Sequence, residues 1–169
     1  MAQLDGGDII YVVRVSVPKI IALRVDIGTL FPAPRTSQGK VLLAALSRES
    51  LDATLATPSR SGLPASIGRS REALDEELTQ VRARGWAIAD EELAPGVRSI
   101  AVPVRDGTGT VRAAMNVTAH AAETSTEKLL DDHPPQLLLA AGDVSADWAA
   151  WLSRPHRDVP EPSRTTDTS

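Results

Sequence analysis

The chain has 169 residues, 42% of them hydrophobic, which is enough for one globular domain with a buried core. It contains no cysteine, which excludes disulfides, thiolate metal sites and a cysteine nucleophile. A net charge of -4, with only three Trp, one Tyr and one Phe, argues against nucleic-acid binding by this chain, because such binding usually needs a basic face or a stacking surface.

The first predicted elements are two strands. Residues 9–17, IIYVVRVSV, and residues 20–27, IIALRVDI, are rich in β-branched side chains, and Pro18-Lys19 separates them. Residues 1–8 are expected to be a flexible N-terminal remnant. No stretch approaches the ~18 consecutive apolar residues of a membrane-spanning helix, and the N-terminus lacks a secretory signal, so a cytoplasmic location is expected.

Two helices are predicted next. The stretch TSQGKVLLAALSRESL, residues 36–51, carries apolar residues at helical spacing, with Thr36 or Ser37 as the candidate N-cap. After a connection rich in Pro, Gly and Ser, a second helix is predicted, with Ser70 as its cap and Gly85 as its C-terminal stop.

A β-hairpin is predicted after a short strand at residues 86–90. Its strands, 97–105 and 110–118, flank the turn sequence DGTG. The expected register puts residue 105 opposite 110, 99 opposite 116 and 97 opposite 118. One face is then wholly apolar and suits packing against helices. The other carries small and mildly polar side chains, among them Ser99 and Asn116, and suits a cavity or contact with water.

The C-terminal part predicts a short helix with a capping box from Thr124 to Glu127, ended by Pro134-Pro135. A last amphipathic helix then runs to Trp151. Residues 153–169 contain three prolines and almost no apolar residue, so this tail is expected to be disordered.

Catalytic chemistry finds little support in the sequence. A phosphate loop around Gly39-Lys40 fails, because Pro34 and Val41 stand where Gly and Ser or Thr are needed. The three histidines form no triad motif, and no GxSxG sequence is present. The acidic run at residues 90–92 is better explained by a structural role, since neighbouring strand residues point to opposite faces and no histidine lies near it.

The remaining candidate for a site is the start of the first predicted helix, residues 36–39. Its free backbone N–H groups and its positive dipole end suit a carboxylate. The alternative is an ordinary capped helix whose end meets only water, because nearly every helix has such an end.

Several motifs occur in a characteristic order, and they are RVSV (14–17), PAPRTSQGKVLLAAL (32–46), RARGWAIADEE (82–92) and PGVRSIAVPVRDGTGTVRAAMNV (95–117). Together they resemble the effector-binding domain of IclR-type transcriptional regulators, most closely the branch that senses protocatechuate and 4-hydroxybenzoate. The resemblance implies an α+β, GAF-like fold, in which a twisted antiparallel sheet has helices on one face and a ligand pocket on the other. It places the effector-binding domain at residues 9–152, between the N-terminal remnant and the tail.

In that family the effector lies between the sheet and the loop that enters the first helix. The matching positions, implied as ligand-binding, are Ile20, Leu23 and Phe31 as apolar walls, Ser37 and Gln38 at the helix start, and Val97, Ser99, Asn116 and Thr118 on the sheet. Ile20 and Leu23 have opposite strand parity. Ala89 stands where some glyoxylate-type and pyruvate-type members carry an aspartate, which favours a larger, less hydrophilic ligand.

The resemblance therefore implies a bacterial sensor of a small aromatic acid that is not an enzyme and needs no cofactor or metal. It also implies self-association to a dimer or tetramer, and contact with DNA only through an N-terminal winged helix-turn-helix, which is absent from this sequence. Three alternatives remain: a sensor of a small keto acid, an oligomerisation module without a specific ligand, and a hydrolase or isomerase that uses residues 90–92.

Overall fold

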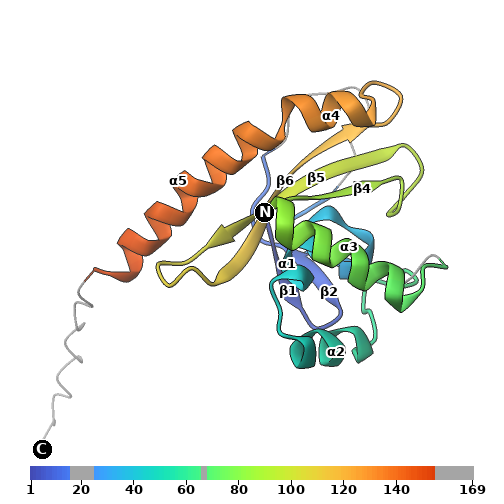
Figure 1. Cartoon of the computed structure of the whole chain (residues 1–169), viewed down its shortest axis with the longest axis horizontal. Coiled ribbons are helices and arrows are strands. Elements are labelled where there is room, and N and C mark those ends of the chain that lie inside the picture. The colour runs from blue at the N-terminus through green and yellow to red at the C-terminus, as the bar shows by residue number, and fades with distance from the viewer. Residues whose placement is uncertain (16–24, 66–67, 155–169) are drawn as a thin grey trace, which may run out of the picture.

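A six-stranded antiparallel sheet forms the centre of the structure, with the strand order β3-β2-β1-β6-β5-β4 (Figure 1). This computed structural model describes residues 1–15, 25–65 and 68–154. The strands are β1 (Ala2–Asp5), β2 (Asp8–Tyr11), β3 (Leu30–Pro32), β4 (Ala87–Asp90), β5 (Val97–Arg105) and β6 (Val111–His120). The expected α+β architecture on an antiparallel sheet is confirmed.

The helices are η1, a 3-10 turn (Ala33–Arg35), α1 (Ser37–Ala44), α2 (Arg48–Ala56), α3 (Arg71–Arg84), α4 (Thr126–Asp132) and α5 (Pro134–Leu152). Thr36, one of the two predicted candidates, caps α1, and Ser70 caps α3 as predicted. Gly85 ends α3 in the left-handed conformation, with φ of 82°. The single helix predicted over residues 36–51 is two helices, because the side chain of Ser47 caps a new one at Ser50 N.

The N-terminal residues belong to the sheet. β1 lies between β2 and β6, with Ala2 opposite both Tyr11 and Ala114. The prediction of a flexible remnant over residues 1–8 is therefore wrong, because these residues pair through their backbone although none of them is β-branched.

The two strands predicted near the N-terminus are also corrected. Within the described residues, the strand predicted over 9–17 is confined to β2, which starts one residue earlier. Residues 25–27 of the second predicted strand form no strand, and residues 20–24 lie outside the described part of the chain. β3 pairs with β2 in its place.

The hairpin of β5 and β6 forms as predicted, but its register differs by two residues. Ser99 lies opposite Thr118 and Val97 opposite His120, whereas the prediction paired residue 99 with 116 and 97 with 118. A longer turn, in which the Asp106 carboxylate accepts hydrogen bonds from the N–H groups of Thr108 and Thr110, places Arg105 opposite Val111, one residue from the prediction. A bulge between Val104 and Arg105 adds the second residue. Beyond the bulge, a shift of two residues preserves side-chain parity, so Ser99 and Asn116 keep their predicted face. Val111, on the turn side of the bulge, packs instead with the core cluster of Ala101 and Ala114.

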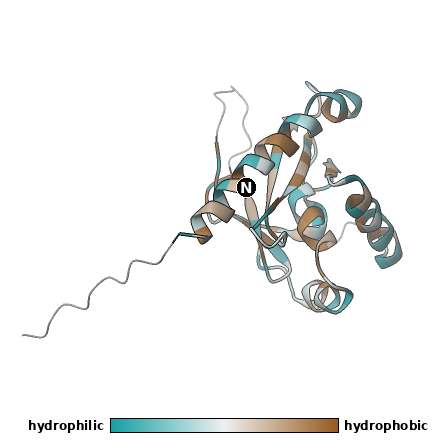
Figure 2. Ribbon diagram, turned by 60° about the vertical axis from the view of Figure 1, so that its left-hand side comes forward, coloured by the Kyte–Doolittle hydropathy of each residue, from teal (hydrophilic) through white to brown (hydrophobic). Residues whose placement is uncertain are grey.

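Helices lie on both faces of the sheet, a wider distribution than the one-sided arrangement that the resemblance implied. α4 and α5 cover the apolar face of the hairpin, where their side chains pack against Ile100, Val102 and Val104. α1 lies on the opposite face, against the small side chains of Ala101 and Ala114, and α3 packs on α1 (Figure 1). In Figure 2, α3 is mostly hydrophilic in colour, whereas hydrophobic and hydrophilic residues alternate along α5.

The C-terminal helices differ slightly from the prediction. Ser125, not Thr124, caps α4, because its Oγ accepts from Lys128 N. In α5, Trp148 packs on the core beneath it, but Trp151 is 61% exposed. Across the described ranges, no helix is both long and apolar enough to cross a membrane. Of the tail expected to be disordered, residues 155–169 lie outside the described residues.

Candidate functional site

The start of α1 lies directly against the sheet. Ser37 and Gln38 are both buried, and Ser37 Oγ lies 2.8 Å from Ser99 Oγ of β5. Gln38 Nε2 donates a hydrogen bond to the backbone oxygen of Ala114 in β6, at 3.2 Å. These contacts join the helix start to both strands of the hairpin, and they bring together three of the predicted site residues.

The first turn of α1 retains two backbone N–H groups that have no carbonyl partner within the helix, those of Ser37 and Gln38. The N–H of Gly39 is already bound to Thr36 Oγ1 at 3.0 Å. Gly39 itself is required by close packing, since a Cβ at this position would lie 1.9 Å from the backbone oxygen of Ala33. The end of the helix thus offers two donors and its positive dipole end to an anion.

A row of polar side chains continues from the helix start along the same face of the sheet. Asn116 Nδ2 donates to Thr118 Oγ1 at 2.9 Å, and Thr118 lies opposite Ser99. Asn116 is half-buried and Thr118 is exposed. Hydroxyl and amide groups can both donate and accept, so this row can recognise hydroxyl substituents of a ligand.

Tyr11 is a member of this row that the sequence did not reveal. Its ring meets Phe31 edge to face, with centroids 6.1 Å apart and planes at 88°. Burial raises the pKa of the Tyr11 phenol, against the opposing effects of a hydrogen bond with Asn116 and of the charge of Arg14. The lone tyrosine in a β-branched run was the available signal, but β1 had to be recognised before Tyr11 could be placed near β6.

The other predicted site residues fall into two groups. Val97 is half-buried, faces the same side as Ser99, and lies opposite His120 at the end of the hairpin. Ile20 and Leu23 lie outside the described residues. Ala89 is buried opposite Ser99 in β4, so the position where some relatives carry an aspartate adjoins the polar row.

A buried ion cluster holds α1 in position. Lys40 is fully buried, and its Nζ donates to Glu77 Oε1 at 2.7 Å, to Glu92 Oε1 at 2.6 Å and to the backbone oxygen of Ile88 at 2.9 Å. Arg69 pairs with the same two glutamates. Lys40 therefore fixes α1 to α3 and to the end of β4, a structural role unlike that of a phosphate-loop lysine.

The acidic run at residues 90–92 has structural partners, in agreement with the interpretation from the sequence. Asp90 pairs with Arg98 at 2.6 Å, and this hydrogen bond lowers the pKa of Asp90. Glu91 accepts from Gly96 N at 2.8 Å, and Glu92 belongs to the Lys40 cluster. In the described part of the chain, no group of three or more His, Asp or Glu side chains is placed to hold a metal ion.

Comparison with known proteins gives a consistent picture. Residues 1–146 match the family described as bacterial transcriptional regulator IclR, C-terminal. The chain is 40% identical over 148 residues to the Pca regulon regulatory protein of Pseudomonas putida, covering 85% of this chain and 50% of that protein. It thus spans about half the length of this curated relative.

Two solved structures are similar in fold and in sequence. A transcriptional regulator of Rhodococcus sp. RHA1 has a TM-score of 0.80 and 40% identity, over 88% of this chain and 60% of that one. A double mutant of the inducer-binding domain of PobR from Acinetobacter, in complex with 3-hydroxybenzoic acid, has a TM-score of 0.74 and 30% identity, over 85% of this chain and 84% of that one.

Proposed function

The chain belongs to the IclR family of transcriptional regulators, as the effector-binding C-terminal domain, and from this premise we propose that it binds a small aromatic acid to control transcription. The family consists of regulators and not of enzymes, so ligand binding, without turnover, is the activity of the domain. The full-length relatives extend well beyond the region matched here. Contact with DNA is therefore proposed through a part of the regulator that this chain does not include, and a cytoplasmic location belongs to the same proposal.

One observation supports the proposal best: the start of α1 meets a polar row on the sheet. The N–H groups of Ser37 and Gln38, which have no carbonyl partner within the helix, suit a carboxylate, an effect of roughly 0.3–2 kcal/mol from the helix dipole. Phe31 offers an apolar wall to a ring. Ser99, Asn116 and Thr118 then suit ring hydroxyls, because a buried hydroxyl left unpaired costs about 1–3 kcal/mol.

The named relatives favour an aromatic acid over a short keto acid. The PobR domain was solved with 3-hydroxybenzoic acid, and the Pseudomonas relative is described as the regulator of the Pca regulon. In this chain Ala89 places a small, buried apolar side chain opposite Ser99, where a carboxylate would make the site more hydrophilic and leave less room. A larger and less hydrophilic acid is the better match.

A thermal-shift screen of the chain tests the proposal. Protocatechuate and 4-hydroxybenzoate are expected to raise the unfolding temperature in a concentration-dependent way, since a ligand that binds only the folded state stabilises it. Pyruvate and glyoxylate serve as the keto-acid comparison, and a larger shift with them would favour the keto-acid alternative. A flat response to all of these acids would favour an oligomerisation module without a specific ligand.

Self-association is a further part of the proposal. The exposed apolar side chains of α5 support it, with Leu139 72%, Trp151 61% and Leu152 52% exposed. Exposed apolar side chains of this kind along a helix suit contact with a second copy of the chain.

A further inference from the structure

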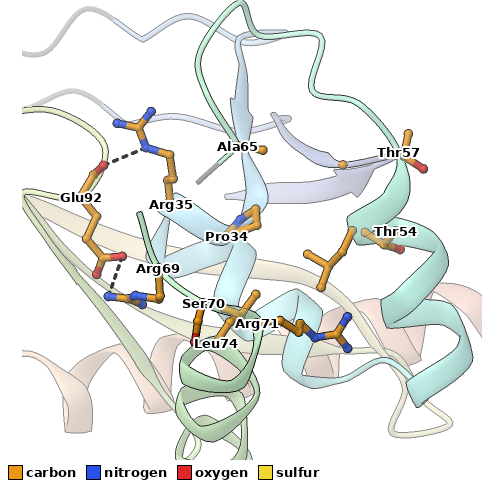
Figure 3. A pocket seen from close by; sticks show the side chains of 12 residues that line it. Pro34, Arg35, Thr54, Thr57, Ala65, Arg69, Ser70, Arg71, Leu74 and Glu92 are labelled. Atoms are coloured by element: carbon orange, nitrogen blue, oxygen red, sulfur yellow. Dashed lines mark hydrogen bonds and ion pairs between the residues drawn. The ribbon is translucent and has the colours of Figure 1, made fainter. Parts of the chain in front are cut away.

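A cavity of about 210 Å³ lies away from the candidate site, between η1, α2 and the start of α3 (Figure 3). Its walls include Pro34, Leu55 and Leu74, with Thr54 of α2 and Thr57 directly after that helix. Gly7, in the turn before β2, gives part of the lining without a side chain. A cavity of roughly 150 Å³ with apolar walls is large enough for benzene, so this one has room for a substituted single ring.

The charged groups around the cavity are already paired with protein groups. Arg69 pairs with Glu92, as Figure 3 marks, and also with Glu77. Arg71 pairs with Asp52 and Asp75. Among the described residues, no buried side-chain nitrogen or oxygen lacks a hydrogen-bond partner. An anionic or strongly polar ligand would have to break one of these pairs, so the chemistry of the walls favours an uncharged ligand.

Arg35 favours an aromatic ligand over an aliphatic one. Each of its three guanidinium nitrogens already donates to a backbone oxygen: Nε to Glu92 at 2.9 Å, Nη1 to Pro64 and Nη2 to Leu93, both at 3.0 Å. These bonds use three of its five N–H donors and fix the orientation of the guanidinium plane, and Arg35 lines the cavity in this fixed position. The face of a guanidinium group stacks favourably on aromatic rings.

We propose that this cavity is a second ligand site, which takes a small, uncharged, single-ring aromatic molecule. It differs from the candidate effector site in its lining residues and in its chemistry, because the effector site offers helix N–H groups and hydroxyls whereas the cavity offers apolar walls. Pro34 and Arg35 directly precede the Thr36 cap of α1, so a ligand here contacts the segment that leads into the effector site.

The test uses toluene as the probe and amide NMR of the whole chain as the readout. Toluene is expected to produce saturable chemical-shift changes of the Gly7, Ser70 and Leu74 amides. The amide shifts of Ser99 and Asn116 should not change. The variant Thr54→Phe fills the cavity without removing any bond described above, and it should weaken toluene binding at least tenfold. Ala53→Phe is the matched control, since Ala53 is the exposed neighbour on the same helix and lies outside the cavity lining; it should bind toluene as wild type does.

Three results would overturn the proposal: no saturable shift, shifts centred on Ser99 and Asn116, or equal binding by wild type and a folded Thr54→Phe. The shifts in wild type decide the location even when the variant fails to fold. Benzoate, titrated into the same sample, tests the proposed function separately through the amides of Ser37, Ser99 and Asn116. If toluene shifts its amides but benzoate does not, the second site is supported and the proposed function is not. If benzoate shifts its amides but toluene does not, the proposed function is supported and the second site is not.

Discussion

Asn116 is the residue whose substitution best tests recognition of the ligand ring. It bonds to Thr118 along its own strand and to Tyr11, so a purely cross-strand role toward Ser99 does not apply. Asn116→Leu is expected to weaken hydroxylated benzoates more than benzoate itself, by about tenfold for each 1.4 kcal/mol lost. Isothermal titration of both proteins with benzoate and its hydroxylated forms measures this difference.

The matched control is Gln80→Leu, which replaces an exposed amide on α3 and should leave every affinity unchanged. Equal losses for all ligands in Asn116→Leu would mean that Asn116 shapes the sheet and does not recognise ring substituents.

Lys40 is the residue whose loss should cost the most stability. Lys40→Met keeps the length of the buried side chain but leaves the partly buried Glu77 and Glu92 without their central cation. Breaking a buried ion pair in this way costs about 3–5 kcal/mol, so urea unfolding should show a clear loss of stability. The control Arg60→Met removes an exposed pair with Asp5, worth about 0–1 kcal/mol. Equal, small effects of the two substitutions would contradict the structural role of Lys40.

Tyr11 gives a prediction in pH. It is the single tyrosine, so phenolate absorbance reports on it alone, and its midpoint should lie higher in the folded chain than in denaturant. Because the pKa of Tyr11 is raised in the folded state, the un-ionised phenol contributes to the free energy of unfolding. This contribution is fully present below about pH 10 and is lost as the pH rises through the folded-state pKa. The Tyr11→Phe variant should lose less stability at alkaline pH than wild type, because it has no phenol to ionise. A folded-state midpoint at or below that in denaturant would show that Tyr11 is not buried in this way.

At the scale of the elements, the Asp106 turn and the bulge beside it set the register of the hairpin. The Asp106 carboxylate also accepts from Thr108 Oγ1 and Arg112 Nε, both at 2.6 Å, and these bonds hold its pKa well below the usual range. Asp106→Ala is expected to lower the unfolding temperature at neutral pH, whereas Asp147→Ala, at an exposed site on α5, should not. An unchanged unfolding temperature in both would mean that strand pairing alone sets the register.

This turn also shows how far the sequence predicts the fold. Alternation along β5 and β6 identified the correct faces beyond the bulge, because side-chain parity survives a shift of two residues, but it assigned Val111 to the wrong face. It did not give the register, which depends on a turn held by four hydrogen bonds to one carboxylate and on the bulge between Val104 and Arg105. Caps at Thr36 and Ser70 were found because they depend on local sequence. Tyr11 was missed because its position near Asn116 depends on β1, whose composition does not favour a strand.

At the scale of the whole molecule, the exposed end of α5 predicts association. Light scattering at micromolar concentrations is expected to give a mass above the 17.9 kDa monomer. Trp151→Lys should shift the population toward monomer, because it places a charge in an exposed apolar surface. Leu63→Lys is the control, since Leu63 is 38% exposed but lies in a connection far from α5 in sequence. A monomeric mass for wild type would contradict the proposal.

The central position of β1 bears on how the chain folds during synthesis. Ala2 of β1 pairs with Ala114 of β6, so β1 is synthesised 112 residues before the strand that pairs with it. At roughly 5–20 residues per second, that interval is on the order of ten seconds on the ribosome. Throughout it, one edge of the nascent β1-β2-β3 ribbon has no strand beside it, and open edges invite pairing with other chains. We therefore expect slow translation after residue 32 to favour aggregation of this domain, and rapid delivery of β6 to protect it.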